Sequence, residues 1–182
     1  RVQAIRYISE EEDAVDPNTQ WGLLPPHPLA GQPVNTFVNA PGGTSSTRRT
    51  LCGSNSMQGL FLERTIYEFE ETNSISNVIL HLRAAIGHVW FRQVYRYPHC
   101  WLDRHIKFIQ PAEIARANPN GSSCHGSVMV FMGRDHNTYL RWLDTFSKFG
   151  HIPGHNCWSS KIPKVNIVCG KPTTNSEDSV GE

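Results

Sequence analysis

A short turn, Asn39-Ala40-Pro41-Gly42, is the segment of this chain whose residue types most directly suggest ligand binding. It follows residues 34–39, a β-branched and aromatic run that predicts a strand. In an α/β sheet, ligands bind where the chain leaves the carboxyl ends of the strands. Asn39 is the only one of the four residues with a side chain that accepts a hydrogen bond, so its amide is the candidate binding group. A turn that only ends a strand is the competing interpretation.

Cysteine and histidine side chains make a metal site the second chemical possibility. Thiolate and imidazole ligands for a tetrahedral zinc ion could come from Cys124, His125, His151, His155 and Cys157. No closely spaced cysteine pair accompanies them, and the two groups fall on separate predicted loops. Buried thiols and surface histidines explain these residues more simply, so we expect no bound zinc.

Hydrophobic patterning predicts the elements that position Asn39. Helical spacing of apolar residues predicts helices over residues 57–71, 88–95 and 137–149, the first capped by Ser56 or Asn55 and the last ended by Gly150. Strand patterns cover residues 77–82, 106–109, 127–132 and 165–169, and residues 99–102 form a strand or a turn. Strands that alternate with helices indicate an α/β sheet, in which residues 36–38, 78–82 and 128–132 are central strands.

The bulk composition limits the class of protein. A chain of 182 residues is long enough for one domain, which we expect over residues 1–169, followed by a disordered tail over residues 170–182. Because the formal net charge is only +1, any contact with nucleic acid must come from a local basic patch. Five widely spaced cysteines indicate reduced thiols and an intracellular protein, either cytoplasmic or nuclear. No apolar run approaches the ~20 residues of a membrane span, so we expect no membrane partner.

Several segments, in order along residues 4–155, together resemble the phage-type DNA N6-adenine methyltransferases. Residues 38–43, Val-Asn-Ala-Pro-Gly-Gly, resemble the amino-methyltransferase motif, in which Asn or Asp is followed by Pro-Pro and an aromatic residue. Residues 4–14, followed by Trp21, are similar to the stretch that precedes the motif in this family. The family's next segments are resembled, in order, by the strand at 78–82 with the later Trp90-Phe91, the segment 103–108 and the strand at 127–133.

The resemblance implies a fold and a reaction. The expected fold is a Rossmann-like methyltransferase sheet with helices on both faces, and the expected reaction is methyl transfer from S-adenosylmethionine to adenine N6 in DNA. The Asn39 side-chain oxygen and the Ala40 carbonyl would accept the two N–H groups of the amine and drive its nitrogen toward tetrahedral geometry. Pro41 would stiffen the turn that holds them. The base would have to leave the duplex to reach this turn.

Further residues gain candidate roles from the resemblance and from their charge. Asp13 and Ala14 correspond to a segment near the adenine of the cofactor, although Asp13 also closes an acidic run that suits a solvated face. Arg48 and Arg49 could bind DNA phosphates, which need no fixed geometry, or lie in a solvated loop. Arg104 resembles a residue near the family's active site, and a surface ion pair is the alternative.

The chain departs from the family pattern at the motif itself. Ala40 replaces the first proline, and Gly42 stands where the family has a ring that stacks on the flipped base. Losing such a stack costs roughly 1–3 kcal/mol, and either Trp90 or Phe91 would have to replace it unless both belong to the core. The family's cofactor-binding aspartate segment would precede Arg1, so we expect either that the domain is incomplete at its N-terminus or that cofactor binding is impaired. Two functions therefore remain open: a methyltransferase, or a degenerate domain that binds nucleic acid or another partner.

Overall fold

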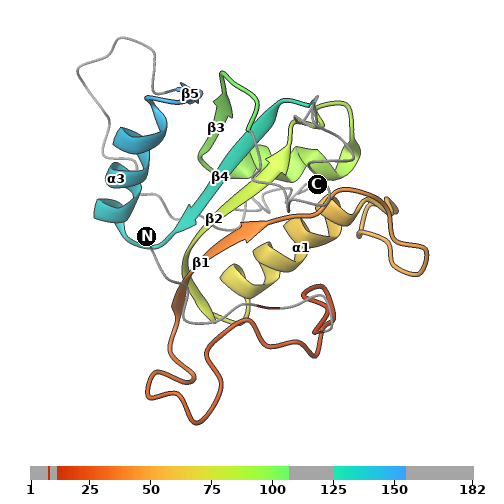
Figure 1. Cartoon of the computed structure of the whole chain (residues 1–182), viewed down its shortest axis with the longest axis vertical. Coiled ribbons are helices and arrows are strands. Elements are labelled where there is room, and N and C mark those ends of the chain that lie inside the picture. The colour runs from red at the N-terminus through yellow and green to blue at the C-terminus, as the bar shows by residue number, and fades with distance from the viewer. Residues whose placement is uncertain (1–7, 9–11, 107–124, 155–182) are drawn as a thin grey trace, which may run out of the picture.

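A mixed five-stranded sheet forms the centre of the protein. The computed structural model describes residues 8, 12–106 and 125–154. The strands lie in the order β1-β2-β4-β3-β5, and Figure 1 shows them between the helices. Their bounds are β1 (Val34–Asn39), β2 (Ile75–Arg83), β3 (His99–Leu102), β4 (Ser127–Gly133) and β5 (Gly150–His151).

The directions of the strands divide the sheet into two parts. β1 and β2 run parallel, whereas β4 is antiparallel to both of its neighbours, β2 and β3. β5 pairs antiparallel with β3 at the far edge. The expectation of an α/β fold is confirmed, and the three predicted central strands are consecutive neighbours in one sheet. Because only one pair is parallel, the sheet is mixed rather than uniformly wound.

The crossover between β1 and β2 is the helix α1 (Met57–Glu70). Ser56 is its N-cap, as predicted, and its hydroxyl accepts from the backbone N–H of Gly59 at 3.4 Å. Gly59, Leu62, Ile66 and Phe69 recur at helical spacing and are all buried. This face of α1 therefore packs on the sheet. The N-cap residue and the helical spacing of apolar residues predict the helix from the sequence.

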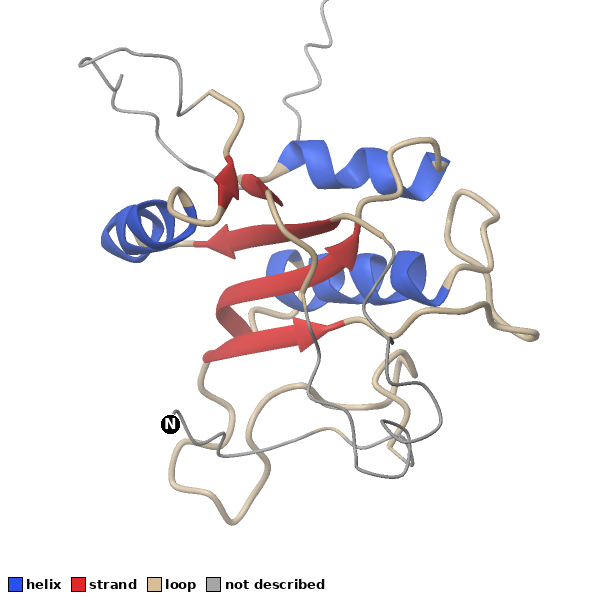
Figure 2. Cartoon of the chain, turned by 45° about the horizontal axis from the view of Figure 1, so that its top comes forward, coloured by secondary structure: helices blue, strands red, loops and turns tan. Residues whose placement is uncertain are grey.

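Each face of the sheet carries its own hydrophobic core. Val78, Val128 and Val130 belong to the cluster that contains α1 and the 3-10 helix η1 (Val89–Arg96). Phe131, whose side chain alternates to the other face of β4, packs with α3 (His136–Phe146). Helices therefore cover both faces, with α1 packed against β2 and α3 against β4, and Figure 2 shows the helices around the sheet.

Trp90 and Phe91 belong to the core. Their exposed fractions are 2% and 0%, and η1 presses Trp90 onto the backbone of α1. A Cβ atom built on Gly59 would lie 3.0 Å from Cγ of Trp90, so only glycine permits this contact. Neither ring is available to stack on a ligand, which excludes both as replacements for the missing ring at Gly42.

The end of α3 differs from the prediction. The helix ends at Phe146 with Ser147 as its C-cap, and Gly150 is not the residue that ends it. Gly150 instead belongs to β5, opposite Leu102. A Cβ atom on Gly150 would lie 2.0 Å from the carbonyl oxygen of Trp101. Glycine at this position therefore allows β5 and β3 to approach closely. A sequence pattern for helix ends does not detect this requirement.

Other predicted segments lie outside the described residues. These are nearly all of the strand at 106–109, the strand at 165–169 and the tail at 170–182. Among the helices that the structure describes, none is both long and apolar enough to cross a bilayer.

The close contact at Gly150 predicts a loss of stability on substitution. Gly150→Ala should lower the free energy of unfolding by about 1–3 kcal/mol, because the added methyl group meets backbone rather than a movable side chain. Gly87→Ala is the matched control, since nothing lies within 4 Å of a Cβ atom at that position. Chemical denaturation of the three proteins measures the difference, and equal midpoints for Gly150→Ala and wild type would contradict the contact.

Candidate functional site

A cavity opens where the carboxyl ends of β1 and β2 meet the start of α1. Its volume is about 510 Å³, within the range of small-molecule sites. It is lined by Asn39, Ala40, Pro41, Gly42, Gly43, Ser56, Gln58, His81, Arg83, His125, Gly126 and Ser127. The four residues of the predicted turn are all among them, so the structure brings the whole candidate motif to one site.

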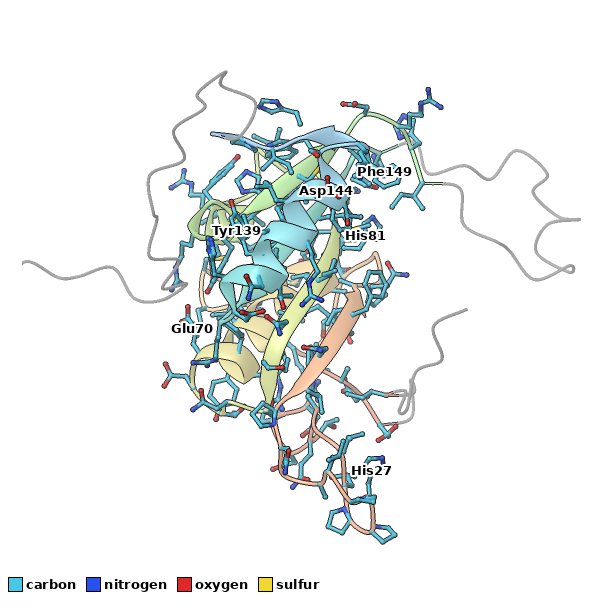
Figure 3. All side chains as sticks on the ribbon, turned by 90° about the vertical axis from the view of Figure 1, so that its left-hand side faces the viewer. His27, Glu70, His81, Tyr139, Asp144 and Phe149 are labelled. Carbon is cyan, nitrogen blue, oxygen red and sulfur yellow. The ribbon has the colours of Figure 1, made fainter. Side chains whose placement is uncertain are left out.

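Asn39 is fixed by a histidine on the neighbouring strand. The parallel register places Asn39 directly beside His81, and Nδ1 of His81 lies 2.7 Å from Oδ1 of Asn39. An amide oxygen can only accept, so Nδ1 of the ring is the donor. Figure 3 labels His81 on β2, close to β1. Asn39 itself is exposed at the end of its strand, whereas His81 is 6% exposed.

The carbonyl of Ala40 is held by a second side chain. Nε2 of Gln58 donates to this carbonyl at 3.2 Å, and Oε1 of Gln58 accepts from the backbone N–H of Arg83 at 3.0 Å. The backbone N–H of Ala40 also donates to the carbonyl of His81 at 3.3 Å. The Gln58 amide therefore bridges the end of β1 to the end of β2 from the first turn of α1.

The electrostatic character of the cavity is set by neutral and basic groups. Among the described residues that line it there is no carboxylate, and the only aromatic rings are the imidazoles of His81 and His125. Burial lowers the pKa of His81 from its usual value of 6.5, so this ring is neutral at pH 7. The site suits a polar ligand that donates hydrogen bonds to oxygen.

The two glycines of the turn have different conformational requirements. Gly43 has a φ angle of 97°, in the region that favours glycine, and its carbonyl accepts from the N–H of Met57 at 3.0 Å. Gly42 has no such constraint, and nothing lies within 4 Å of a Cβ atom built on it. A side chain at Gly42 would therefore fit the backbone and extend into open space beside the cavity.

Asp13, Ala14 and Arg48 lie together but outside the cavity lining. A carboxylate oxygen of Asp13 lies 2.7 Å from the guanidinium of Arg48, which also pairs with Asp16 at 3.2 Å. The carbonyl of Ala14 accepts from Nε1 of Trp21 at 2.8 Å. Residues predicted to bind a cofactor and DNA thus neutralise each other and attach the acidic segment to the loop that leads to α1.

The remaining predicted residues are placed separately. Nη1 of Arg49 donates to the carbonyl of Gly53 at 3.1 Å within its own loop. Arg104 is exposed after β3, next to His105, whose Nδ1 donates at 3.0 Å to the carbonyl of the cavity residue His125. Of the candidate zinc ligands, Cys124, His155 and Cys157 lie outside the described residues. Within the described part of the chain, no group of three or more potential ligands is found.

Sequence reasoning missed four side chains that shape the cavity: Gln58, His81, Arg83 and Ser127. His81 had a detectable signal, because it is the one polar residue within the apolar run at residues 78–82 of β2. Gln58 follows the helix cap by two residues, a position without a specific pattern. Its role becomes visible only when β1 and β2 are placed side by side.

Comparison of the chain with protein-family models, curated proteins and solved structures gave no match. The site is therefore interpreted from its own geometry.

The lowered pKa of His81 predicts a dependence of stability on pH. The unfolded chain takes up a proton at this ring near pH 6.5, but the folded protein does so only at lower pH, so stability falls as the pH drops from about 7 toward the folded pKa. His81→Gln should reduce this decline, measured as the free energy of unfolding from pH 7.5 to 5. His88→Gln, an exposed histidine, is the control. An unchanged slope in His81→Gln would contradict the prediction.

Proposed function

We propose that this chain is a methyltransferase-type domain that binds the exocyclic amine of adenine at Asn39 and transfers a methyl group from S-adenosylmethionine to N6 in DNA. The observation that carries the proposal is the pair of acceptor oxygens at the end of β1. Asn39 and Ala40 line one cavity, and Oδ1 of Asn39 and the carbonyl of Ala40 are each held in place by a side-chain donor from a neighbouring element. The resemblance of the surrounding segments to adenine methyltransferases supports the same reaction, with a Rossmann-like methyltransferase sheet as the finer fold.

Two neighbouring acceptors are what an aromatic amine requires. The lone pair of the adenine amine is delocalised into the ring, which makes the nitrogen a poor nucleophile. Hydrogen bonds from both N–H groups to Asn39 and Ala40 favour a tetrahedral nitrogen with a localised lone pair. Each carbonyl oxygen has two lone pairs, so the bonds from His81 and Gln58 leave one acceptor position on each oxygen.

The described residues fit the amine-binding half of this reaction better than the cofactor half. S-adenosylmethionine, when bound, supplies the methyl group as a sulfonium. The carboxylate of Asp13 is engaged by Arg48 and does not line the cavity. No described residue is therefore assigned to the cofactor, and the proposal rests on the amine acceptors.

A second function, binding without catalysis, is favoured by one observation. A flipped base normally stacks on a ring in its pocket, but neither Gly42 nor any other described lining residue supplies a phenyl, phenol or indole ring. Trp90 and Phe91 are buried in the core. A degenerate domain that holds nucleic acid or another partner at this cavity is consistent with these facts, and turnover separates the two functions.

Removing the side-chain acceptor tests the proposed reaction. Asn39→Ala should lower kcat by roughly 100- to 1,000-fold, the usual cost of losing one preorganised hydrogen bond to the transition state. The protein should remain folded but lose about 1–3 kcal/mol of stability, because the exposed Asn39 side chain is the acceptor for the buried His81 ring. The measurement is transfer of a labelled methyl group to adenine-containing DNA, with melting temperature recorded in parallel.

Asn35→Ala is the matched control for this substitution. Asn35 is an exposed asparagine on β1 whose Oδ1 accepts from Asn77 at 2.9 Å, away from the cavity. It should retain wild-type turnover. Equal activity of wild type and Asn39→Ala would show that Asn39 is not the acceptor, and no turnover by wild type would favour binding without catalysis.

The open space at Gly42 predicts that a ring can be restored there. Gly42→Tyr should raise adenine affinity or turnover, with an expected gain of about tenfold for one base–aromatic stack. Gly42→Leu adds apolar bulk without a ring and should give a smaller gain. Binding of adenine-containing single strands, measured for all three proteins, distinguishes stacking from bulk. Equal affinities for the tyrosine and leucine variants would reject a stacking position.

The ion pairs of Arg48 predict unequal contributions of two arginines to DNA binding. Arg48 faces two carboxylates, whereas Arg83 lines the cavity and makes no ion pair with any residue that the structure describes. Arg83→Gln should therefore weaken binding and reduce the slope of log affinity against log salt by about 1. Arg48→Gln should change the slope less. A larger change in slope for Arg48→Gln would contradict this assignment.

A further inference from the structure

The bond between His81 and Asn39 carries information about the protonation of the ring. A neutral imidazole has one N–H, and in water the proton can occupy either nitrogen. The orientation of the Asn39 amide, with Oδ1 toward the ring at 2.7 Å, is compatible only with a proton on Nδ1. If the proton were on Nε2, Nδ1 would have to accept from the amide nitrogen, and the amide would turn by half a rotation.

The position of the proton on His81 decides whether Oδ1 or Nδ2 of Asn39 faces the ring. The bond from His81 fixes Oδ1 where β1 and β2 end, and Asn39 is one of the residues that line the cavity. The backbone bond from Ala40 to the His81 carbonyl holds the two residues in register. The side chain of Asn39 is otherwise exposed and would lose its orientation without the ring.

We propose that His81 is a positioning residue, whose Nδ1–H tautomer orients the Asn39 amide so that Oδ1 presents its second lone pair to a substrate amine. The catalytic consequence rests on the proposed function, but the hydrogen bond and the tautomer do not. The His81 ring acts through Asn39 and does not itself contact the amine.

The surroundings of His81 show that no carboxylate supports the ring from the neighbouring strands. β1 contributes Asn39, and the residue opposite His81 on β4 is Met129, so neither partner carries charge. Among the described residues, the other titratable groups that line the cavity are Arg83, two residues further along β2, and His125 before β4. Neither is a carboxylate, and burial lowers the pKa of the His81 ring. His81 therefore remains a neutral donor at physiological pH.

Protonation of His81 should weaken the acceptor that it positions. A cationic ring would keep its bond to Oδ1, but it would draw electron density from that oxygen and repel positive charge that develops on the amine. Turnover should therefore fall as the pH drops through the pKa of His81, below 6.5. His81→Gln keeps an N–H donor that does not titrate, so this acid limb should disappear while activity at pH 7.5 stays within about threefold of wild type.

The decisive measurement uses the full chain labelled with ¹⁵N at histidine. Two-bond ¹H–¹⁵N spectra at pH 7.5 distinguish a protonated from an unprotonated Nδ1. We expect His81 to carry its proton on Nδ1 in wild type and to shift toward the Nε2–H form in Asn39→Ala, while the spectrum of His88 is unchanged. A proton on Nε2 in wild type, or the same tautomer in both proteins, would overturn the proposal.

Kinetics separate positioning from a purely structural role. His81→Leu removes the donor, and kcat should fall by roughly tenfold, equivalent to one hydrogen bond, with KM little changed. If His81→Leu fails to fold, the tautomer measurement and the pH profile of His81→Gln still decide the question. An Nδ1–H tautomer without any turnover would reject the proposed reaction and retain the orienting bond. Turnover with an Nε2–H tautomer would reject the positioning role alone.

Discussion

The parallel pairing of β1 with β2 is the constraint on which the cavity depends. Parallel strands end at the same edge of a sheet, so the turn after Asn39 and the end of β2 at Arg83 must meet. The pairing also requires a crossover, and the buried face of α1 supplies it. The first turn of that helix returns to the same edge, which is why Gln58 reaches both strand ends. A shift of one residue in register would turn His81 away from Asn39 and point it toward the core of α1.

How much of the structure could be predicted from sequence depended on whether the determining contacts are local. α1, β1, β2 and β4 follow from cap residues and apolar periodicity within each segment, and their predicted positions agree closely with the structure. Gly150 was misassigned because its requirement comes from Trp101, which lies on another strand. The position of Asn39 could be predicted, but its partner His81 is separated by 42 residues and depends on register. Side chains that complete the cavity therefore required the fold itself.

The roles of charged residues were also hard to predict from sequence, because their partners lie far apart along the chain. Asp13 and Arg48 each suggested a ligand when considered alone, one for a cofactor and the other for phosphate. The fold joins them, and with Asp16 they form a small network that is partly exposed. Such pairs contribute little to stability, typically 0–1 kcal/mol. Their consequence is local: they tie the segment at residues 13–16 to the loop that precedes the N-cap of α1.

The cavity wall provides neutral acceptors that are already oriented. Carboxylates are absent among its described residues, so an amine would meet two carbonyl oxygens rather than a negatively charged acceptor. A neutral acceptor binds an uncharged amine only modestly in the ground state, and its bond strengthens as the N–H groups become more acidic during methyl transfer. Free side chains would have to be ordered during that step. His81 and Gln58 orient the two acceptor oxygens when the protein folds, because both side chains project from elements fixed by the core. The hydrogen bonds that appear to compete with the amine for these oxygens are therefore what would make the oxygens effective acceptors.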